Sequence, residues 1–345
     1  MSIRLRIKQR LISRLLDKRK KQDPFDPTTI ENYTLPEGAD KYAINSYFFS
    51  CHNMDGETLM MRHAVRGEDI TEVWFAYRDA DGNEYICEQQ HYEGAPPPTT
   101  VQCLQIEKRW LFSYDGNVIN QKTKEVCAAK FEGTFTATRG MFDFSRHLPS
   151  RGMAAAIANE KWSKAYFNEL KKHDQVHIEQ PGRLKGTLNL GGRKIALDMS
   201  MMRDHSYGRR DWNEMNSHFW LTCMFEDGTM FNANVASWPT IKSIATGFME
   251  RGEEALGVVS AQVNCEIEDY KVPEKFSYSG ELVNGEKFKL DCVLESVFLF
   301  TLDHGNYLIY EGVGTFDMNG KRGRGNLEFG FNGDPGRIVK LGCPQ

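Results

Sequence analysis

Asn-Gly and Asp-Gly pairs recur along this chain between short runs in which apolar and polar residues alternate. Such a pair adopts positive φ at low cost and closes a two-residue hairpin, and a period of two is typical of a strand with one buried face. The runs 42–50, 58–65, 70–78 and 84–91 therefore predict an antiparallel meander. The pairs stand at 81–82, 115–116, 227–228, 284–285 and 319–320.

One segment interrupts the pattern. Residues 150–172 carry Met153, Ile157, Trp162 and Tyr166 at helical spacing, with Ser150 as a possible cap, which predicts one helix. Strand patterns stand on both sides of it, and 345 residues are enough for two domains.

We therefore predict an all-β chain of two antiparallel barrel domains joined by a helical linker. The first covers 42–175 with the helix at about 150–172, and the second covers 176–345. Barrels are favoured over sandwiches because closure removes exposed strand edges.

Residues 1–22 differ in character from the rest. Ile3, Ile7, Leu11 and Leu15 recur every four residues among nine Lys and Arg and one Asp, which predicts a basic amphipathic helix, followed by a linker over 23–41. This helix could lie on an anionic membrane surface, direct the chain to a mitochondrion, or dock on its own domain. With a net charge of −4 for the whole chain, +8 in this segment leaves −12 elsewhere.

The acidic body argues against nucleic acid as a partner, because nucleic-acid binding requires basic surface. The eight cysteines are scattered without a CxxC pair, which is typical of reduced thiols in a cytoplasmic protein. No apolar run is long enough for a membrane span or a secretory signal. His177, His205 and His218 lack metal-site spacing, so no metal is expected.

The densest polar and aromatic stretch covers residues 201–212. If it is extended, Arg203, His205 and Tyr207 face one side of the sheet, and Asp204 and Ser206 face the other. Charged side chains are rarely buried without partners. The stretch therefore indicates either acid–base chemistry or a structural cluster of ion pairs, which would join Arg203 and Asp204 to Arg210 and Asp211.

Residues 203–212, Arg-Asp-His-Ser-Tyr-Gly-Arg-Arg-Asp-Trp, resemble the Arg-Asp-His-Ser-Trp-Gly-x-Arg-Asp-Trp signature of the hydroxyneurosporene synthase (carotenoid hydratase) and AttH-like family. Tyr207 stands where relatives have Trp. A second likeness covers residues 177–186, which are similar to the preceding strand in relatives. The resemblance implies two lipocalin-like β-barrels around an apolar cavity, and relatives that hydrate polyene double bonds or guide cyclisations.

Such reactions on an alkene need a proton donor to carbon, aromatic faces that stabilise a carbocation, and exclusion of stray water. Asp204 or Asp211 could be the acid, His205 could orient or relay the proton, and Tyr207 could supply an aromatic face. We assign catalysis to those four residues. Substrate binding is assigned to Arg203, Trp212, Trp220 and Trp238.

The predicted function is binding of a hydrophobic small molecule of the terpenoid, polyene or polyketide type, with cofactor-free hydration, isomerisation or cyclisation. A non-catalytic lipid carrier or sensor on the same scaffold is the alternative, and a purely structural scaffold is a third possibility. The expected location is the cytoplasm, with peripheral membrane contact through residues 1–22.

Overall fold

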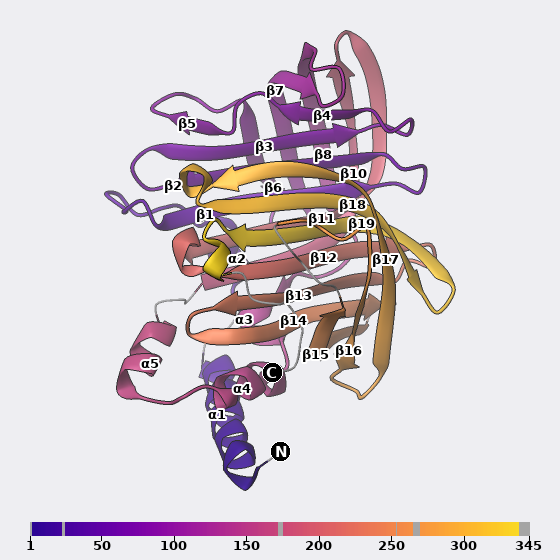
Figure 1. The fold of residues 1–345 in the computed structure, drawn as a ribbon. Helices are drawn as coiled ribbons and strands as arrows, with labels where there is room; N and C mark the ends of the chain where they lie inside the picture. The colour runs from indigo at the N-terminus through magenta and orange to yellow at the C-terminus, as the bar shows by residue number, and fades with distance from the viewer. Residues whose placement is uncertain (1, 23–24, 172–174, 253, 265–269, 338–345) are drawn as a thin grey trace. The chain divides into compact units, whose positions relative to one another are not determined.

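The structure is a computed structural model that describes residues 2–22, 25–171, 175–252, 254–264 and 270–337 (Figure 1). The chain divides into two compact units. The N-terminal barrel unit comprises Asp26–Asp143 and Gln175–Arg210, and the C-terminal barrel unit comprises Met1–Phe25, Phe144–Asp174 and Asp211–Gln345.

The N-terminal barrel unit is a closed antiparallel sheet. Its ring runs β1-β2-β3-β4-β7-β8-β10-β11, and β11 pairs with β1 to complete it. The short strands β5, β6 and β9 pair with β3, β7 and β10. The strands are β1 Ala43–His52, β2 Thr58–Arg66, β3 Ile70–Arg78, β4 Glu84–Cys87, β5 His91–Glu93, β6 Thr99–Gln105, β7 Arg109–Asn120, β8 Val126–Ala137, β9 Phe142–Asp143, β10 Gln175–Leu190 and β11 Arg193–Arg209. The short helix α2 (Pro27–Glu31) precedes them.

The C-terminal barrel unit holds a second closed ring, β12 to β19 in chain order. Its strands are β12 Ser217–Phe225, β13 Met230–Trp238, β14 Ile241–Arg251, β15 Glu254–Asn264, β16 Lys275–Leu282, β17 Lys287–Leu302, β18 Tyr307–Met318 and β19 Lys321–Asn332. Helices α1 (Ile3–Gln22), α3 (Phe144–His147), α4 (Ser150–Asn159) and α5 (Lys164–Leu170) belong to the same unit. Short 3-10 turns lie at Trp212–Glu214, Asp303–Gly305 and Pro335–Arg337. The predicted all-β double barrel is confirmed.

Side chains fill the interior of the C-terminal barrel. Phe219, Tyr278, Phe288 and Phe329 belong to one buried apolar cluster there, and Phe219 packs 5.0 Å from Phe329 between ring centroids. Such interiors are close-packed. This core differs from the apolar cavity that the family resemblance implies.

The boundary between the units differs from the predicted 175/176. Strands β10 and β11 complete the first ring, because β10 pairs with β8 and β11 with β1. The change of unit therefore comes between Arg210 and Asp211, and the helical segment from Phe144 belongs to the C-terminal unit. The turn pairs in the sequence report only on hairpins between neighbouring strands, so they could not show that β10 pairs with β8.

Two local predictions were wrong. The helix expected at 150–172 is two helices, because the chain leaves helical conformation at Glu160 and Ser163 caps α5 by accepting from the Tyr166 N–H; residues 172–174 lie outside the described residues. The expected turn at Asp115-Gly116 is instead strand, since these residues pair with Lys130 and Ala129 within β7 and β8. The other four Asn-Gly and Asp-Gly pairs are turns with positive φ at the glycine.

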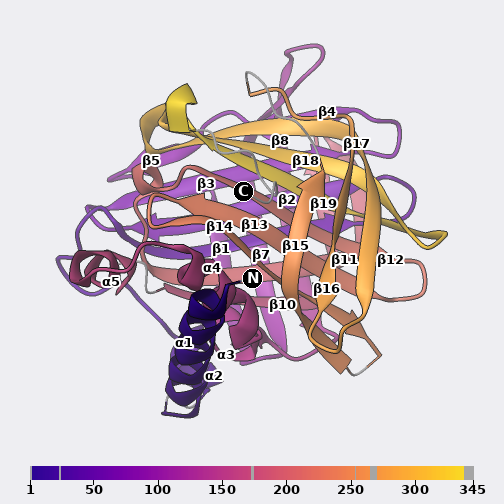
Figure 2. The same ribbon diagram turned by 60° about the horizontal axis from the view of Figure 1, so that its bottom comes forward.

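Helix α1 packs on α4, which contacts β14 (Figure 2). Its Ile12 is buried with Ala154, Ile157, Ile241 and Ile244. Of the three interpretations of residues 1–22, docking on its own unit is therefore observed. No helix in the described part of the chain is both long and apolar enough to cross a membrane.

Candidate functional site

Strand β11 places the motif residues on alternate faces. Arg203 and His205 pair across the sheet with Phe49 and Tyr47, and they point into the N-terminal barrel with its buried aromatic residues. Asp204 points to the outer face, as the alternation predicts. These motif residues of the N-terminal unit are thereby divided between the barrel core and its outer surface.

Arg203 is the centre of an ion-pair network inside the barrel. Its guanidinium donates to Glu31 Oε1 at 2.6 Å and to Gln180 Oε1 at 2.8 Å, and it lies 4.6 Å from the ring centroid of Trp110. Burial raises the pKa of Glu31 while the positive charge of Arg203 opposes that rise. Arg203 is 1% exposed, so the structure places it in a core rather than at an open binding surface.

His205 and Tyr207 extend this interior as a stack of rings. The His205 ring lies 4.1 Å from that of Tyr47, and Tyr207 stacks on Tyr33 at 3.8 Å. His205 Nε2 lies 2.9 Å from Asn45 Oδ1. Burial lowers the pKa of His205 well below its usual value, so the ring is neutral. It faces away from Asp204 and cannot relay a proton to it directly.

A neutral buried histidine makes stability depend on pH. Below about pH 6.5 the unfolded chain binds a proton at this residue that the folded chain does not, so stability falls as the pH falls. We expect His205→Gln to reduce the loss of unfolding free energy between pH 6.5 and 5.5 by about 1 kcal/mol. Urea unfolding of both proteins at the two pH values measures it. An equal pH dependence in both would contradict a neutral His205.

The outer face of β10 and β11 brings together three titratable groups. His177 Nε2 lies 2.8 Å from Asp204 Oδ2 and 3.8 Å from Glu179 Oε1. The cross-strand pairing of Glu179 with Asp204 explains the arrangement, because His177 is two residues from Glu179 on the same face. The side chains of His177 and Asp204 are 19% and 18% exposed, whereas that of Glu179 is buried. We call this group the His177 cluster.

The donor types of the His177 cluster are also those that bind divalent cations, and their ligand atoms lie within 4.8 Å of one another. The imidazole and the Asp204 carboxylate are, however, hydrogen-bonded to each other. The arrangement is therefore that of a proton-sharing acid–base pair next to a buried carboxylate.

Aromatic side chains lie on the same face. Phe48 is directly opposite Asp204 on β1, and the Trp74 ring lies 6.1 Å from that of Phe48. Arg62 lies over Trp74 at 4.7 Å and donates to Glu72 at 2.6 Å. Aromatic faces can stabilise a nearby cation. Sequence reasoning missed Phe48, Trp74 and Glu179, because only strand register shows that they share a face with Asp204.

The remaining predicted site residues lie in the C-terminal unit. Asp211 accepts from the Asn213 N–H and caps the turn Trp212–Glu214. Trp212 lies 5.2 Å from the ring of Tyr307, and Trp220 lies 5.5 Å from that of Phe144. Trp238 packs against the apolar cluster of α1 and α4. These residues do not form one group within the unit.

A second acid–base group in the C-terminal unit was not predicted. His218 Nδ1 lies 2.8 Å from the Tyr307 hydroxyl, and its Nε2 contacts Glu328 Oε1. Burial raises the pKa of Tyr307 well above its usual value. The neutral hydroxyl and the His218–Glu328 contact could hold a proton, and the Trp212 ring lies 6.5 Å from that of His218.

Two pockets of modest size lie away from the motif. One, of about 230 Å³, is lined by Arg251, Phe288 and Met318 in the C-terminal unit. The other, of about 290 Å³, is lined by Asp79, Tyr85 and Arg193 in the N-terminal unit.

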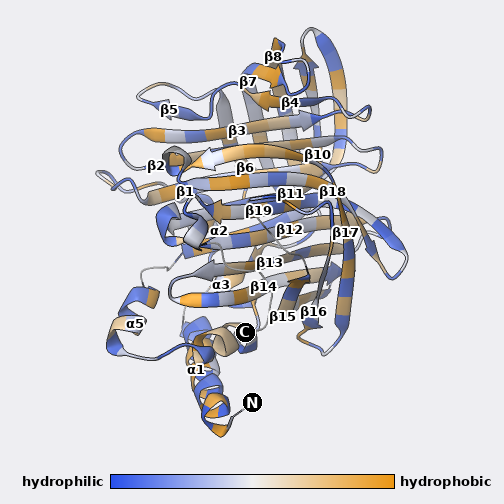
Figure 3. Ribbon diagram, viewed as in Figure 1, coloured by the Kyte–Doolittle hydropathy of each residue, from blue (hydrophilic) through white to orange (hydrophobic). Residues whose placement is uncertain are grey.

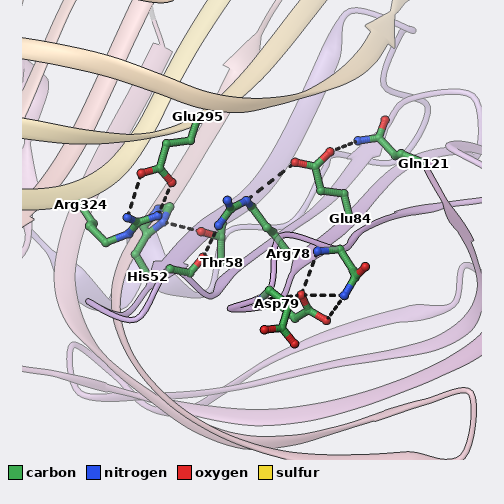
Figure 4. A network of polar contacts seen from close by, with 11 residues as sticks. His52, Thr58, Arg78, Asp79, Glu84, Gln121, Glu295 and Arg324 are labelled. Carbon is green, nitrogen blue, oxygen red and sulfur yellow. Dashed lines mark hydrogen bonds and ion pairs between the residues drawn. The ribbon is translucent and has the colours of Figure 1, made fainter.

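Polar contacts fix residues of the second pocket and their sequence neighbours. Asn83 donates to Asp79, and Gln121 donates to Glu84, which pairs with Arg78 (Figure 4). Of these residues, Asp79 and Asn83 line the pocket, and they are hydrogen-bonded to each other.

Comparison with solved structures shows the fold. A protein of Nitrosomonas europaea described as an AttH aligns with a TM-score of 0.54 at 13% identity, covering 87% of this chain and 98% of that one. Kievitone hydratase from Nectria haematococca aligns at 0.52 and 12%, covering 88% and 94%. CghA, in complex with Sch210972, aligns at 0.52 and 7%, covering 87% and 93%. At these identities the likeness concerns the double barrel.

Sequence comparison identifies the family. No curated protein is similar enough in sequence to count as a relative. A family profile described as "Domain of unknown function (DUF7064)" matches residues 51–333, which span both barrels and include the His177 cluster. The chain therefore belongs to the DUF7064 family, and it has the double β-barrel fold of AttH and kievitone hydratase.

Proposed function

We propose that this protein binds a hydrophobic small molecule of the terpenoid, polyene or polyketide type and catalyses a cofactor-free hydration, isomerisation or cyclisation of it. The observation that carries the proposal is the His177 cluster. It combines a partly accessible carboxylate–imidazole pair with a buried carboxylate, and two aromatic rings lie on the same face of the N-terminal barrel. The fold shared with kievitone hydratase and CghA supports the same class of reaction.

For a hydration, the proposed steps conserve protons. Protonated Asp204 gives its proton to one alkene carbon, and the positive charge that forms on the other carbon lies near the faces of Phe48 and Trp74. Water adds to that carbon and loses a proton to His177. His177, 2.8 Å away, then returns the proton to Asp204. One water molecule has been added across the double bond, and the cluster is restored.

The filled C-terminal barrel weighs against the alternative of a lipocalin-type carrier. Such a carrier holds its ligand inside a barrel, and this interior is occupied by the side chains of one apolar cluster. A partly accessible acid–base pair also has no role in carriage alone. The enzyme proposal is therefore preferred.

The direct test is incubation of the purified protein with a prenylated aromatic compound, an acyclic terpene and a linear polyene in D₂O, followed by mass spectrometry. A hydratase is expected to yield a product heavier by one D₂O, with one deuterium bound to carbon. An isomerised or cyclised product with carbon-bound deuterium also supports proton transfer. A product without such deuterium would indicate a pericyclic reaction, and no product together with no co-purified lipid would contradict both binding and catalysis.

A further inference from the structure

Helix α1 has two apolar faces, of which the fold uses one. The docked face presents Ile12, which is buried, with Leu16 packed against the same cluster. Lys8 Nζ donates to the carbonyl oxygens of Ala158 and Glu160 and lies 4.4 Å from the Trp162 ring. Lys20 also donates to the Leu148 carbonyl. These contacts fix which side of α1 faces the C-terminal unit.

The opposite side carries a row of exposed aliphatic side chains. Ile3, Ile7, Leu11 and Leu15 are 79%, 62%, 50% and 55% exposed. They recur every four residues, so they follow one another along the helix surface, and Figure 3 shows apolar and polar residues alternating along α1. Four large exposed aliphatic residues in one row are unusual for the surface of a soluble unit and mark an interaction site.

Exposed positive charges surround this row. Successive residues of an α-helix are rotated by about 100° around its axis, so the four aliphatic side chains span a sector of about 120°. Arg4, Arg14 and Lys18 project within that sector. Arg10 and Lys21 flank it on one side. All five are exposed. The exposed side of α1 is thus a mixed band of aliphatic side chains and cations, which we call the α1 band.

We infer that the α1 band binds the surface of an anionic lipid bilayer. A helix lying in the interfacial plane inserts its aliphatic side chains among the acyl chains, while Arg and Lys extend their charged ends to the lipid phosphates. Each cation near an anionic leaflet strengthens binding. The band matches this chemistry, since the aliphatic row and the cations share one face.

Protein partners fit the band less well. A second copy would bring two segments of charge +8 together, and like charges at such a contact oppose association. A partner helix would need an apolar seam that keeps facing it along the whole length of α1, as the a and d positions of a heptad repeat do. The row of α1 turns by about 40° at each step and contains cations within the sector. A fluid charged surface accepts this geometry, whereas a packed protein interface does not.

The test is flotation of the full-length protein with vesicles of phosphatidylcholine alone or with 30% phosphatidylserine, at 0.1 M salt. We expect binding only to the anionic vesicles. Ile7→Ser/Leu11→Ser should weaken it by at least about tenfold, and Arg10→Gln/Arg14→Gln by roughly 10- to 30-fold. These residues are exposed, so the thermal midpoint should change little.

Matched controls remove the same groups elsewhere on the C-terminal unit. Val283→Ser/Leu299→Ser replaces two side chains that are 52% and 44% exposed, and Lys275→Gln/Lys287→Gln removes two exposed charges; both should bind vesicles like the unaltered protein. Failure of the unaltered protein to bind anionic vesicles would overturn the inference. So would binding that survives Ile7→Ser/Leu11→Ser, or a dimer in light scattering that this variant dissociates.

Discussion

Replacing Asp204 with asparagine is expected to slow conversion of any compound that the protein hydrates or isomerises by about 10²- to 10⁴-fold. Asparagine keeps the shape of the side chain but cannot donate an acidic proton, and it replaces the carboxylate that lies 2.8 Å from His177 Nε2 with a neutral amide. Binding of the compound should persist, because the aromatic faces of Phe48 and Trp74 are unchanged. Turnover by mass spectrometry and binding by tryptophan fluorescence measure the two effects separately.

Asp198→Asn is the matched control for this variant. Asp198 lies on the same strand and the same face as Asp204, but it is paired with Arg183 in a half-exposed position outside the His177 cluster. It should retain full turnover. A rate for Asp204→Asn within about twofold of the unaltered protein would reject proton donation by the cluster and favour a reaction driven by shape alone.

Arg203→Met is expected to destabilise the protein by about 3–5 kcal/mol. The substitution keeps much of the side-chain volume but leaves the Glu31 carboxylate, which is 3% exposed, without its guanidinium partner. A buried charge that loses its counter-charge is among the most destabilising changes in a protein core. The thermal midpoint should fall by roughly 6–20 °C, as measured by calorimetry or dye-binding melts.

Two further variants separate charge from packing. Glu31→Gln/Arg203→Met removes both charges and should recover most of the loss, because no unpaired charge then stays in the core. Arg183→Met removes a half-exposed arginine that pairs with Asp198, and it should cost less than about 1 kcal/mol. If the double variant is no more stable than Arg203→Met, the ion pair is not the source of the stability.

Much of the architecture follows from local sequence signals. Alternating runs and the Gly turn pairs predicted strands β1, β2 and β3 almost to the residue, because hairpins between adjacent strands depend on short-range patterns. The alternation at 203–207 likewise predicted which motif residues share a face. These are properties of two or three neighbouring strands.

The errors concern contacts between distant segments. Nothing local shows that Gln180 on β10 lies beside Arg203 inside a barrel, or that Glu31 from α2 reaches the same arginine. The motif was read as one site, but its residues point to opposite faces and, after Arg210, enter a different unit. His177 was considered only as a metal ligand and as part of a similar strand, and cross-strand register was needed to set it next to Asp204.

The position of α1 in the fold also has a consequence for synthesis. Its buried Ile12 packs with Ile241 and Ile244, so α1 cannot complete this contact until residues more than 200 positions later have been synthesised. At about 5–20 residues per second, that interval is roughly 10–50 s. During it, the docked face and the α1 band are both exposed on the nascent chain. Helix α1 therefore reaches its native place only long after its own synthesis, and the translation rate sets how long it is accessible.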